Sequence, residues 1–365
     1  MSEASDIKAP NPPIRVLLIA ATLPIIGGQT VQANRLWKMM RLEPGIRMDI
    51  QSINPVFLPR LQNIKYIRTA VTLLKYVFDL LCAVPKYDVL HVFSASYTSF
   101  VISPSPALLI AKLFGKPTIL NYHSGEAADH LTRWKKTAIP TIKQFDKTIV
   151  PSAYLVDVFR TFDLPAKEIF NFVDTDSFTF RKRDPLKPIF LSNRNFEPHY
   201  NITCTLRTFK LIQSMVPDSS LIVVGDGSQN TLLKDLSAEL GLKNIDFRGA
   251  IDPTEMPAIY AESDIYLNAS SIDNMPLSLL EAFSAGLPVV STNAGGIPYI
   301  VENERTGLLV DIDDHEALAE AALRLLRDNE FAQGIIKSAQ EEVKRYSWEN
   351  VRDQWLCVYR ELANK

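Results

Sequence analysis

Two acidic residues, Asp273 and Glu281, lie on either side of the predicted start of a short helix in the second half of the chain. Pro276 suits the first position of that helix, because the N–H group that proline lacks would be unpaired there in any case. The free backbone N–H groups of Leu277, Ser278 and Leu279 would then form a site for an anion. Helical side chains lean toward the N-terminus, so Glu281, just over one turn further along, can accept hydrogen bonds from hydroxyls of the same ligand. The pattern predicts a site for a polyhydroxylated phosphate ester, although either acid alone could equally be solvated beside a capped helix.

Other groups that could bind a ligand follow predicted strands. The pair Gly27-Gly28 would let the backbone pass close to a ligand, or else form only a tight turn. His123 follows the predicted strand 118–122, where it is either structural or faces a ligand. Glu126, three residues later, either starts a helix or contacts a second substrate. Arg194 offers a bidentate fork for a diphosphate, unless it forms a surface ion pair.

A further glycine-containing turn, Gly225-Asp226-Gly227, follows the predicted strand 221–224. A dinucleotide-binding fingerprint would need another glycine at position 230, which is Asn230, so that class of ligand is disfavoured. Two D-x-D sequences, 174–176 and 311–313, have the spacing of a metal site. Neither is expected near the chemistry, and we therefore predict a site without a metal ion.

Short apolar and β-branched runs position these groups, because each run ends in polar or small residues and is followed by a helical pattern. The predicted strands are 15–20, 89–93, 118–122 and 148–151 in the first half, and 189–192, 221–224, 245–248, 265–268, 289–292 and 308–310 in the second. Continuous apolar strands that alternate with helices indicate parallel sheets covered on both faces, with ligands beyond the carboxyl ends of the strands. We predict an α/β fold with two doubly wound, Rossmann-like parallel-sheet domains that face a central cleft.

The charged, proline-containing segment 181–188 is the predicted linker between the two series of strands. Residues 1–180 then form an N-terminal domain and residues 181–346 a C-terminal domain. Residues 347–365 have apolar side chains at helical spacing, which predicts an amphipathic terminal helix that packs back on the N-terminal domain.

The composition limits the classes of function. The 365 residues carry a formal net charge of −2, without the basic excess typical of nucleic-acid binders, so no nucleic-acid partner is expected. Cys82, Cys204 and Cys357 lack metal-ligand spacing and are too few for a disulfide framework. The chain starts with an acidic, proline-rich leader, and its apolar run at 70–84 contains charges and is too short to span a bilayer. We expect a cytoplasmic protein made without an export signal.

Residues 270–292 (SSIDNMPLSLLEAFSAGLPVVST) resemble the nucleotide-sugar signature of family 4 glycosyltransferases, in which two acids separated by seven residues precede A-x-G-x-P-V-V. The likeness continues into 293–298 (NAGGIP) and 306–310 (TGLLV). It implies a GT-B fold and a retaining, metal-independent transfer of a hexose-type sugar from a nucleoside diphosphate, with no cofactor. Two positions depart from the family pattern: the first acid is Asp273 instead of Glu, and His199 stands where Lys usually follows Arg194 by five residues.

The resemblance also implies roles for the candidate residues. Arg194 and the N–H groups at Leu277 and Ser278 would stabilise the diphosphate, and the leaving phosphate would act as the base. Glu281 would anchor the ribose, and Asp273 and His123 would hold the sugar from opposite sides of the cleft. Further substrate contacts are implied for Gly27, Gly28, Gly225, Asp226, Arg248 and Asn274.

The implied partners are a nucleotide-sugar donor and a sugar, lipid-linked or small-molecule acceptor, in the synthesis of a cell-surface glycan, polysaccharide or glycolipid. Two other functions remain open at this point. A nucleotide-sugar epimerase of the same architecture would need additional acids or bases around the sugar. A non-catalytic nucleotide-sugar sensor would only bind the donor.

Residues 60–86 mix basic with apolar side chains. In a helix, one side would carry Tyr66, Ala70, Leu73, Val77, Leu80 and Leu81. This pattern fits an ordinary sheet-covering helix, or a surface helix that touches anionic lipid. Because many members of the resembling family build lipid-linked glycans from the cytoplasmic side, we predict weak peripheral association with the inner face of a membrane.

Overall fold

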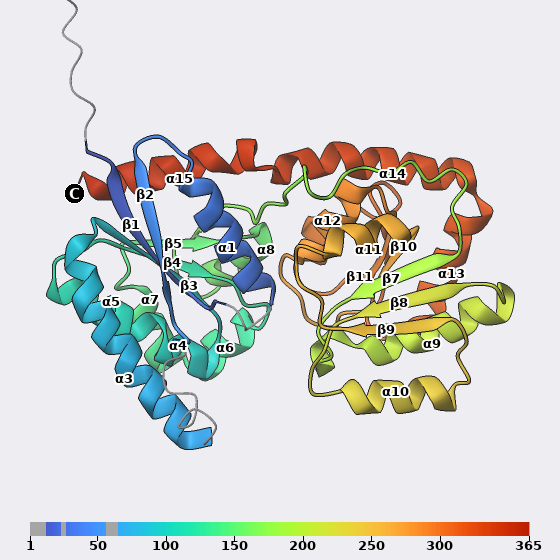
Figure 1. Cartoon of the computed structure of the whole chain (residues 1–365), viewed down its shortest axis with the longest axis horizontal. Helices are drawn as coiled ribbons and strands as arrows, with labels where there is room; N and C mark the ends of the chain where they lie inside the picture. Colours follow the sequence, from blue (N-terminus) through green and yellow to red (C-terminus); the bar gives the residue numbers. More distant parts are fainter. Residues whose placement is uncertain (1–11, 23–26, 56–64, 365) are drawn as a thin grey trace, which may run out of the picture.

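The computed structural model describes residues 12–22, 27–55 and 65–364, and for residues 65–68 it describes the backbone only. Within these ranges the chain forms two parallel six-stranded sheets, which lie in opposite halves of the molecule (Figure 1). The first sheet has the order β2-β1-β3-β4-β5-β6, and the second has the order β12-β11-β10-β7-β8-β9. The prediction of an α/β fold with two doubly wound parallel sheets is confirmed.

All ten predicted strands are present. The first sheet consists of β1 (Ile14–Ala20), β2 (Ile46–Ser52), β3 (Val89–Ser94), β4 (Thr118–Tyr122), β5 (Lys147–Val150) and β6 (Lys167–Glu168). The second consists of β7 (Ile189–Asn193), β8 (Ser220–Val224), β9 (Ile245–Gly249), β10 (Ile265–Asn268), β11 (Val289–Thr292) and β12 (Leu308–Val310). Only β2 and β6 are absent from the prediction. Both are edge strands, β2 alternates with polar residues and β6 has two residues, so neither shows the continuous apolar run of a central parallel strand.

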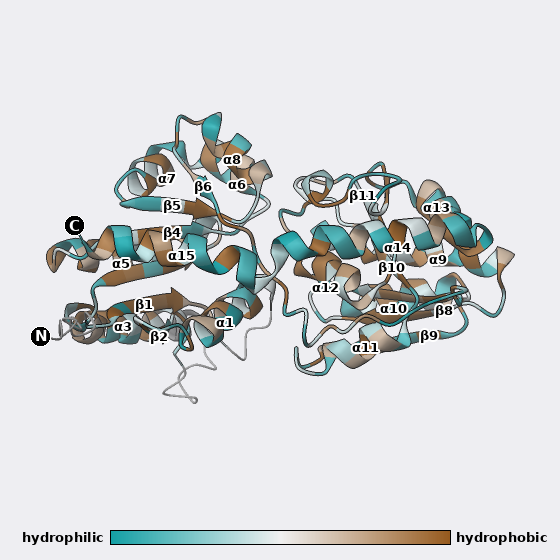
Figure 2. Cartoon of the chain, turned by 90° about the horizontal axis from the view of Figure 1, so that it is seen from above, coloured by the Kyte–Doolittle hydropathy of each residue, from teal (hydrophilic) through white to brown (hydrophobic). Residues whose placement is uncertain are grey.

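Helices cover both faces of each sheet. One face of the first sheet packs against α1 (Gly28–Met40) and α15 (Trp348–Ala363). The other face packs against α3 (Lys65–Ala83), α5 (Pro104–Leu113), α6 (Ala127–Arg133), α7 (Lys135–Ile142) and α8 (Ala153–Arg160). The short helix α4 (Tyr97–Ile102) lies beside α5. On the second sheet, α11 (Met256–Glu262) and α12 (Leu277–Ala285) lie opposite α9 (Ile202–Met215), α10 (Asn230–Glu239) and α13 (His315–Arg327), and α14 (Asn329–Val343) contacts both α12 and α13. In Figure 2 strand β1 is brown, the colour of hydrophobic residues, whereas the helices around it carry both brown and the teal of hydrophilic residues. Its side chains alternate between the two faces, so the first sheet has an apolar core on each face. The second sheet likewise has one on each face.

The last helix of the chain returns to the first sheet. Trp355, Val358 and Leu362 of α15 are buried in the core that contains β1 and β3. Figure 1 shows α14 and α15 running one after the other along the same side of both halves. The chain therefore crosses between the halves twice, and the domain boundary at residue 180 stays a prediction.

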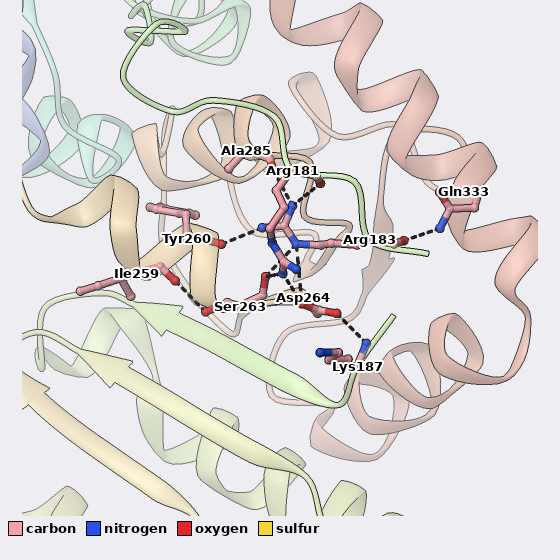
Figure 3. A network of polar contacts seen from close by, with 9 residues as sticks. All are labelled: Arg181, Arg183, Lys187, Ile259, Tyr260, Ser263, Asp264, Ala285 and Gln333. Atoms are coloured by element: carbon pink, nitrogen blue, oxygen red, sulfur yellow. Dashed lines mark hydrogen bonds and ion pairs between the residues drawn. The ribbon is translucent and has the colours of Figure 1, made fainter. Parts of the chain in front are cut away.

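The segment 181–188, predicted to be a linker, is fastened to the second half by the fully buried Arg183 (Figure 3). Its Nε donates to the carbonyl oxygen of Ser263 at 2.7 Å, and its Nη2 to that of Tyr260 at 2.7 Å, both near the end of α11. Its Nη1 donates to the carbonyl oxygen of Ala285 at the end of α12. Burial lowers the pKa of Arg183 to about 10, which leaves it charged at neutral pH. A cation stabilises helix C-termini, so this side chain helps to hold α12, whose other end forms part of the candidate site.

Candidate active site

A cleft of about 840 Å³ lies between the two sheets, at the carboxyl ends of their strands. Most of its lining comes from the segments that follow β1 and β4 of the first sheet, and from those that follow β7, β8, β9 and β10 of the second. The structure brings eleven of the predicted residues together here: Gly27, Gly28, His123, Arg194, Gly225, Asp226, Asp273, Asn274, Leu277, Ser278 and Glu281. Glu126 and His199 also line the cleft.

Arg194 and Asp273 form an ion pair, and each side chain is about 10% exposed. Arg194 Nη1 donates to Ser278 Oγ at 3.1 Å, and its guanidinium lies over the ring of Tyr200, 4.2 Å from the centroid. Burial alone would lower the pKa of Arg194, but the charge of Asp273 outweighs it and raises the pKa, so the cation is permanent. Within the described part of the chain, Arg194 Nε is buried without a hydrogen-bond partner. The guanidinium is therefore a fixed charge inside the cleft and not part of a surface ion pair.

Helix α12 begins at Leu277, one residue later than predicted. Pro276 is therefore its N-cap and not its first helical residue. The prediction is wrong for Leu279, because its N–H is paired with the carbonyl oxygen of Pro276 at 3.2 Å. The N–H groups of Leu277 and Ser278 have no acceptor among the described residues. Gly286 ends the helix in the left-handed conformation, with φ at 79°, as predicted. Two free N–H groups therefore point out of the helix start beside Arg194, which is the arrangement of an anion site.

Glu281 is 9% exposed and uses both of its carboxylate oxygens. Its Oε1 accepts from Nη2 of Arg35 at 2.7 Å, and its Oε2 accepts from the hydroxyl of Tyr260 at 3.0 Å. Burial, reinforced by the charge of Glu281, raises the pKa of Tyr260 far above its usual value, so the phenol stays a neutral donor. Arg35 and Tyr260 are absent from the sequence prediction. Arg35 lies two turns after Gly28 on the same helix, but that spacing alone does not mark a site residue.

His123 lies at the wall of the cleft that belongs to the first half. Its ring stacks on that of Phe93, with centroids 4.8 Å apart, and its backbone N–H donates to the carbonyl oxygen of Ser94. Burial lowers its pKa to about 3, so the imidazole is neutral at physiological pH. Nε2 is buried and has no partner among the described residues. A neutral ring with a free nitrogen can donate to or accept from one ligand hydroxyl.

The loop with Gly27 and Gly28 and the loop with Gly225 need glycine for different reasons. A Cβ atom on Gly27 or Gly28 would meet nothing within 4 Å, and Gly27 has an extended φ of −172°, so nothing in the described protein demands glycine there. Space kept free of side chains beside the start of α1 fits the close approach of a ligand. Gly225 instead has a φ of +146°, and its Cβ would clash with the carbonyl oxygen of Arg194. The carboxylate of Asp226 accepts from the N–H of Gly227 at 2.8 Å, and the carbonyl oxygen of Asp226 accepts from the N–H of Phe196 at 3.0 Å, so this loop holds the loop of Arg194 in place.

Arg248 is the predicted residue that the structure does not bring into the cleft. Its guanidinium pairs with Asp246 at 2.8 Å and with Glu262 at 2.7 Å. Asp246 and Arg248 are two residues apart on the edge strand β9, so their side chains point to the same side. The cleft is lined instead by Ala250 and Ile251.

Two contacts between the halves involve loops that carry predicted residues. Ser152 Oγ donates to Oδ1 of Asn274, and Asn171 Nδ2 donates to the carbonyl oxygen of Met275 at 3.3 Å. Asn274 therefore has a structural partner besides lining the cleft. Among the described residues, no group of three or more His, Cys, Asp or Glu side chains is placed to hold a metal ion. The prediction of metal-independent chemistry stays a prediction.

Residues 38–177 match the family model described as Glycosyltransferase Family 4, and residues 174–342 match the one described as Glycosyl transferases group 1. The sulfoquinovosyl transferase of Arabidopsis thaliana is 29% identical over 286 residues, which cover 72% of this chain and 54% of that protein. The phosphatidyl-myo-inositol mannosyltransferase of Mycolicibacterium smegmatis is 24% identical over 289 residues, which cover 76% of this chain and 72% of that protein. The chain thus spans about half the length of curated relatives such as the Arabidopsis protein.

The fold is also shared with solved structures. The crystal structure of HepE from Anabaena in complex with UDP and glucose has a TM-score of 0.75, at 17% sequence identity, over 96% of this chain and 100% of that chain. A likeness at this identity shows the fold, here the two-domain GT-B arrangement. The two adjoining family matches and this shared fold agree with the signature at residues 270–292, and the chain belongs to the family 4 glycosyltransferases.

Proposed function

We propose that the protein is a retaining glycosyltransferase that moves a sugar from a nucleoside-diphosphate sugar to a hydroxyl acceptor. The observation that carries this proposal is the fixed charge of Arg194 beside the free N–H groups of Leu277 and Ser278. The barrier lies in separating the anomeric carbon from the diphosphate, and preorganised donors that meet the developing charge lower it. Arg194 and the start of α12 supply positive charge to the diphosphate, and we propose that the transfer uses no metal ion or cofactor.

The other residues of the cleft take supporting roles in this proposal. Glu281 accepts hydrogen bonds from the ribose hydroxyls, and the free Nε2 of His123 binds a sugar hydroxyl from the opposite wall. Asp273 contacts the sugar ring while its other oxygen stays with Arg194. Because no side chain is assigned as a nucleophile, retention follows from attack on the same face, with the leaving phosphate as the base.

Relatives suggest the classes of substrate. The Anabaena structure contains UDP and glucose, and the Mycolicibacterium relative is named for a mannosyl transfer to phosphatidylinositol. We extend to this chain a nucleotide-sugar donor and a sugar or lipid-linked acceptor, in glycan, polysaccharide or glycolipid synthesis. A location in the cytoplasm, with weak contact to the inner face of a membrane, belongs to the same proposal.

A donor panel tests the function. The protein is titrated with UDP-glucose, UDP-N-acetylglucosamine and GDP-mannose in a calorimeter, and each mixture is then analysed for free nucleoside diphosphate and free sugar. Transfer, or slow hydrolysis when no acceptor is present, is the expected result with at least one donor. Isomerised donor without release of the diphosphate would identify an epimerase, and tight binding without any reaction would identify a sensor. Either outcome would overturn the proposal.

A further inference from the structure

Helices α3 and α5 expose an unusual amount of apolar surface. Seven of the fourteen large hydrophobic side chains that are exposed in the described part of the chain lie between residues 74 and 114. Six of them define what we call the α3–α5 surface: Leu74, Phe78 and Leu81 on α3, with Leu109, Leu113 and Phe114 on or just after α5. The two helices pack against each other and lie side by side in Figure 1. The exposed residues are thus neighbours and not scattered.

The side of α3 that faces solvent differs from the side expected from the sequence. Leu80 is buried, and Leu73 and Val77 pack against the core of the first sheet, so the predicted apolar side mainly covers the sheet. The side chain of Tyr66 lies outside the described residues. Leu74 and Phe78, which are 71% and 62% exposed, point away from that core. The helix is therefore apolar on a second side, which folding of the first half does not use.

The same region carries a positive charge. Residues 65–147 contain eleven Lys or Arg and five Asp or Glu, although the whole chain has a net charge of −2. Exposed lysines in it include Lys86, Lys112, Lys135, Lys136 and Lys143, and neither α5 nor α7 contains an acid. Lys112 on α5 donates to Gln144, which follows α7, at 2.9 Å. Lys112 lies on α5 between Leu109 and Leu113, so this lysine is beside the apolar side chains. Helix α7, which carries Lys135 and Lys136, covers the same face of the sheet.

We infer that the α3–α5 surface docks on the face of an anionic lipid bilayer. Exposed apolar side chains enter the interfacial layer, while lysines with long stems reach the lipid headgroups. A second copy of the chain fits less well, because a two-fold contact would bring the same positive charges face to face. No helix among the described residues has the length and apolar character to cross a bilayer, which agrees with contact at the surface. The inference rests on the proposed membrane contact and specifies where it occurs.

Co-sedimentation with vesicles tests this surface. The full chain is mixed with vesicles of phosphatidylcholine, with and without phosphatidylserine, at low and at high salt. We expect binding to the anionic vesicles at low salt and release at high salt, because salt screens the lysines. The variant Leu74→Gln/Phe78→Gln/Leu113→Gln should bind about tenfold more weakly, because its apolar contact is lost. The matched control Leu42→Gln/Met215→Gln, in which exposed apolar residues elsewhere are changed, should bind like the wild type.

Several outcomes would overturn the inference. They are equal vesicle binding by the triple variant and the wild type, no binding of the wild type at any salt, and wild-type dimers in light scattering that the triple variant abolishes. Donor titration of each variant by calorimetry shows separately that the cleft is intact. Transfer of sugar without vesicle binding would contradict the docking surface alone, and vesicle binding without transfer would contradict the proposed enzyme alone.

Discussion

Arg194 and Asp273 belong to the same half of the molecule, whereas Arg35 and Glu281 belong to different halves. The first pair joins residues 79 positions apart around one sheet, and the second joins residues 246 positions apart across the cleft. All four side chains are at most 15% exposed. The first pair can persist whatever the distance between the halves, but the second exists only while α1 and α12 stay close. One acid of the cleft is therefore held locally, and the other depends on how the halves are arranged.

The two pairs also leave different capacity for a ligand. A carboxylate oxygen can accept more than one hydrogen bond, so Glu281 can receive ribose hydroxyls without losing Arg35 or Tyr260. Arg194 has a buried Nε–H without a partner, and can meet a phosphate while it keeps Asp273. We call Arg194–Asp273 the local pair and Arg35–Glu281 the pair across the cleft. We therefore expect the local pair to affect turnover and the pair across the cleft to affect donor affinity.

The largest effect is expected from breaking the local pair. Arg194→Ala should lower kcat by roughly 10²–10³-fold, the range seen when a preorganised donor to a developing charge is removed. It also leaves Asp273 without its cation, so the double variant Arg194→Ala/Asp273→Asn serves as the control for stability. The melting temperature of the double variant should recover, while kcat stays low. Full turnover per folded molecule of Arg194→Ala would make the pair purely structural.

The next effect is on donor affinity. Glu281→Gln should keep the fold and weaken donor binding by roughly 10–100-fold, because a charge-assisted hydrogen bond contributes about 1.5–3 kcal/mol. Calorimetry with the donor chosen from the panel measures it, and thermal melting checks the fold. If affinity and turnover both equal those of the wild type, Glu281 has no place in the site.

A smaller effect tests the connection across the cleft. Arg35→Gln should weaken donor binding by about fivefold, since it removes a hydrogen bond of about 1 kcal/mol that orients Glu281. Arg47→Gln, which changes an exposed arginine on β2, is the matched control. In the Arg35→Gln background, the Glu281→Gln change should cost less than in the wild type, because coupled residues are not additive. Additive costs would show that Arg35 does not act through Glu281.

The last prediction is that removal of metal ions has no effect on turnover. EDTA should leave turnover unchanged, because in the proposed mechanism Arg194 and the start of α12 supply the positive charge that a metal ion would otherwise provide. Complete loss of activity with EDTA, and its recovery with Mg²⁺ or Mn²⁺, would show that the local pair alone does not stabilise the leaving diphosphate.

Much of the local pair could be predicted from the sequence, because its parts belong to short continuous patterns. Arg194 follows a central apolar strand, and Asp273 precedes a helix whose start and end are marked by Pro276 and Gly286. Such signals depend on neighbours along the chain, and for the same reason all ten central or apolar strands were predictable. The edge strands β2 and β6 lack a continuous apolar run, so they were identified only from their pairing in the sheet.

The sequence by itself determined the two series of parallel strands, the signature helix and most residues of the cleft, because each depends on local periodicity and on residues that end strands or start helices. Only the tertiary structure decided that Arg35 meets Glu281, that Arg248 turns away from the cleft, and that Leu74 and Phe78 face solvent. These facts depend on which faces of distant elements come together. A side chain's spacing along its own helix or strand gives its direction relative to that element, but not what the rest of the chain places there.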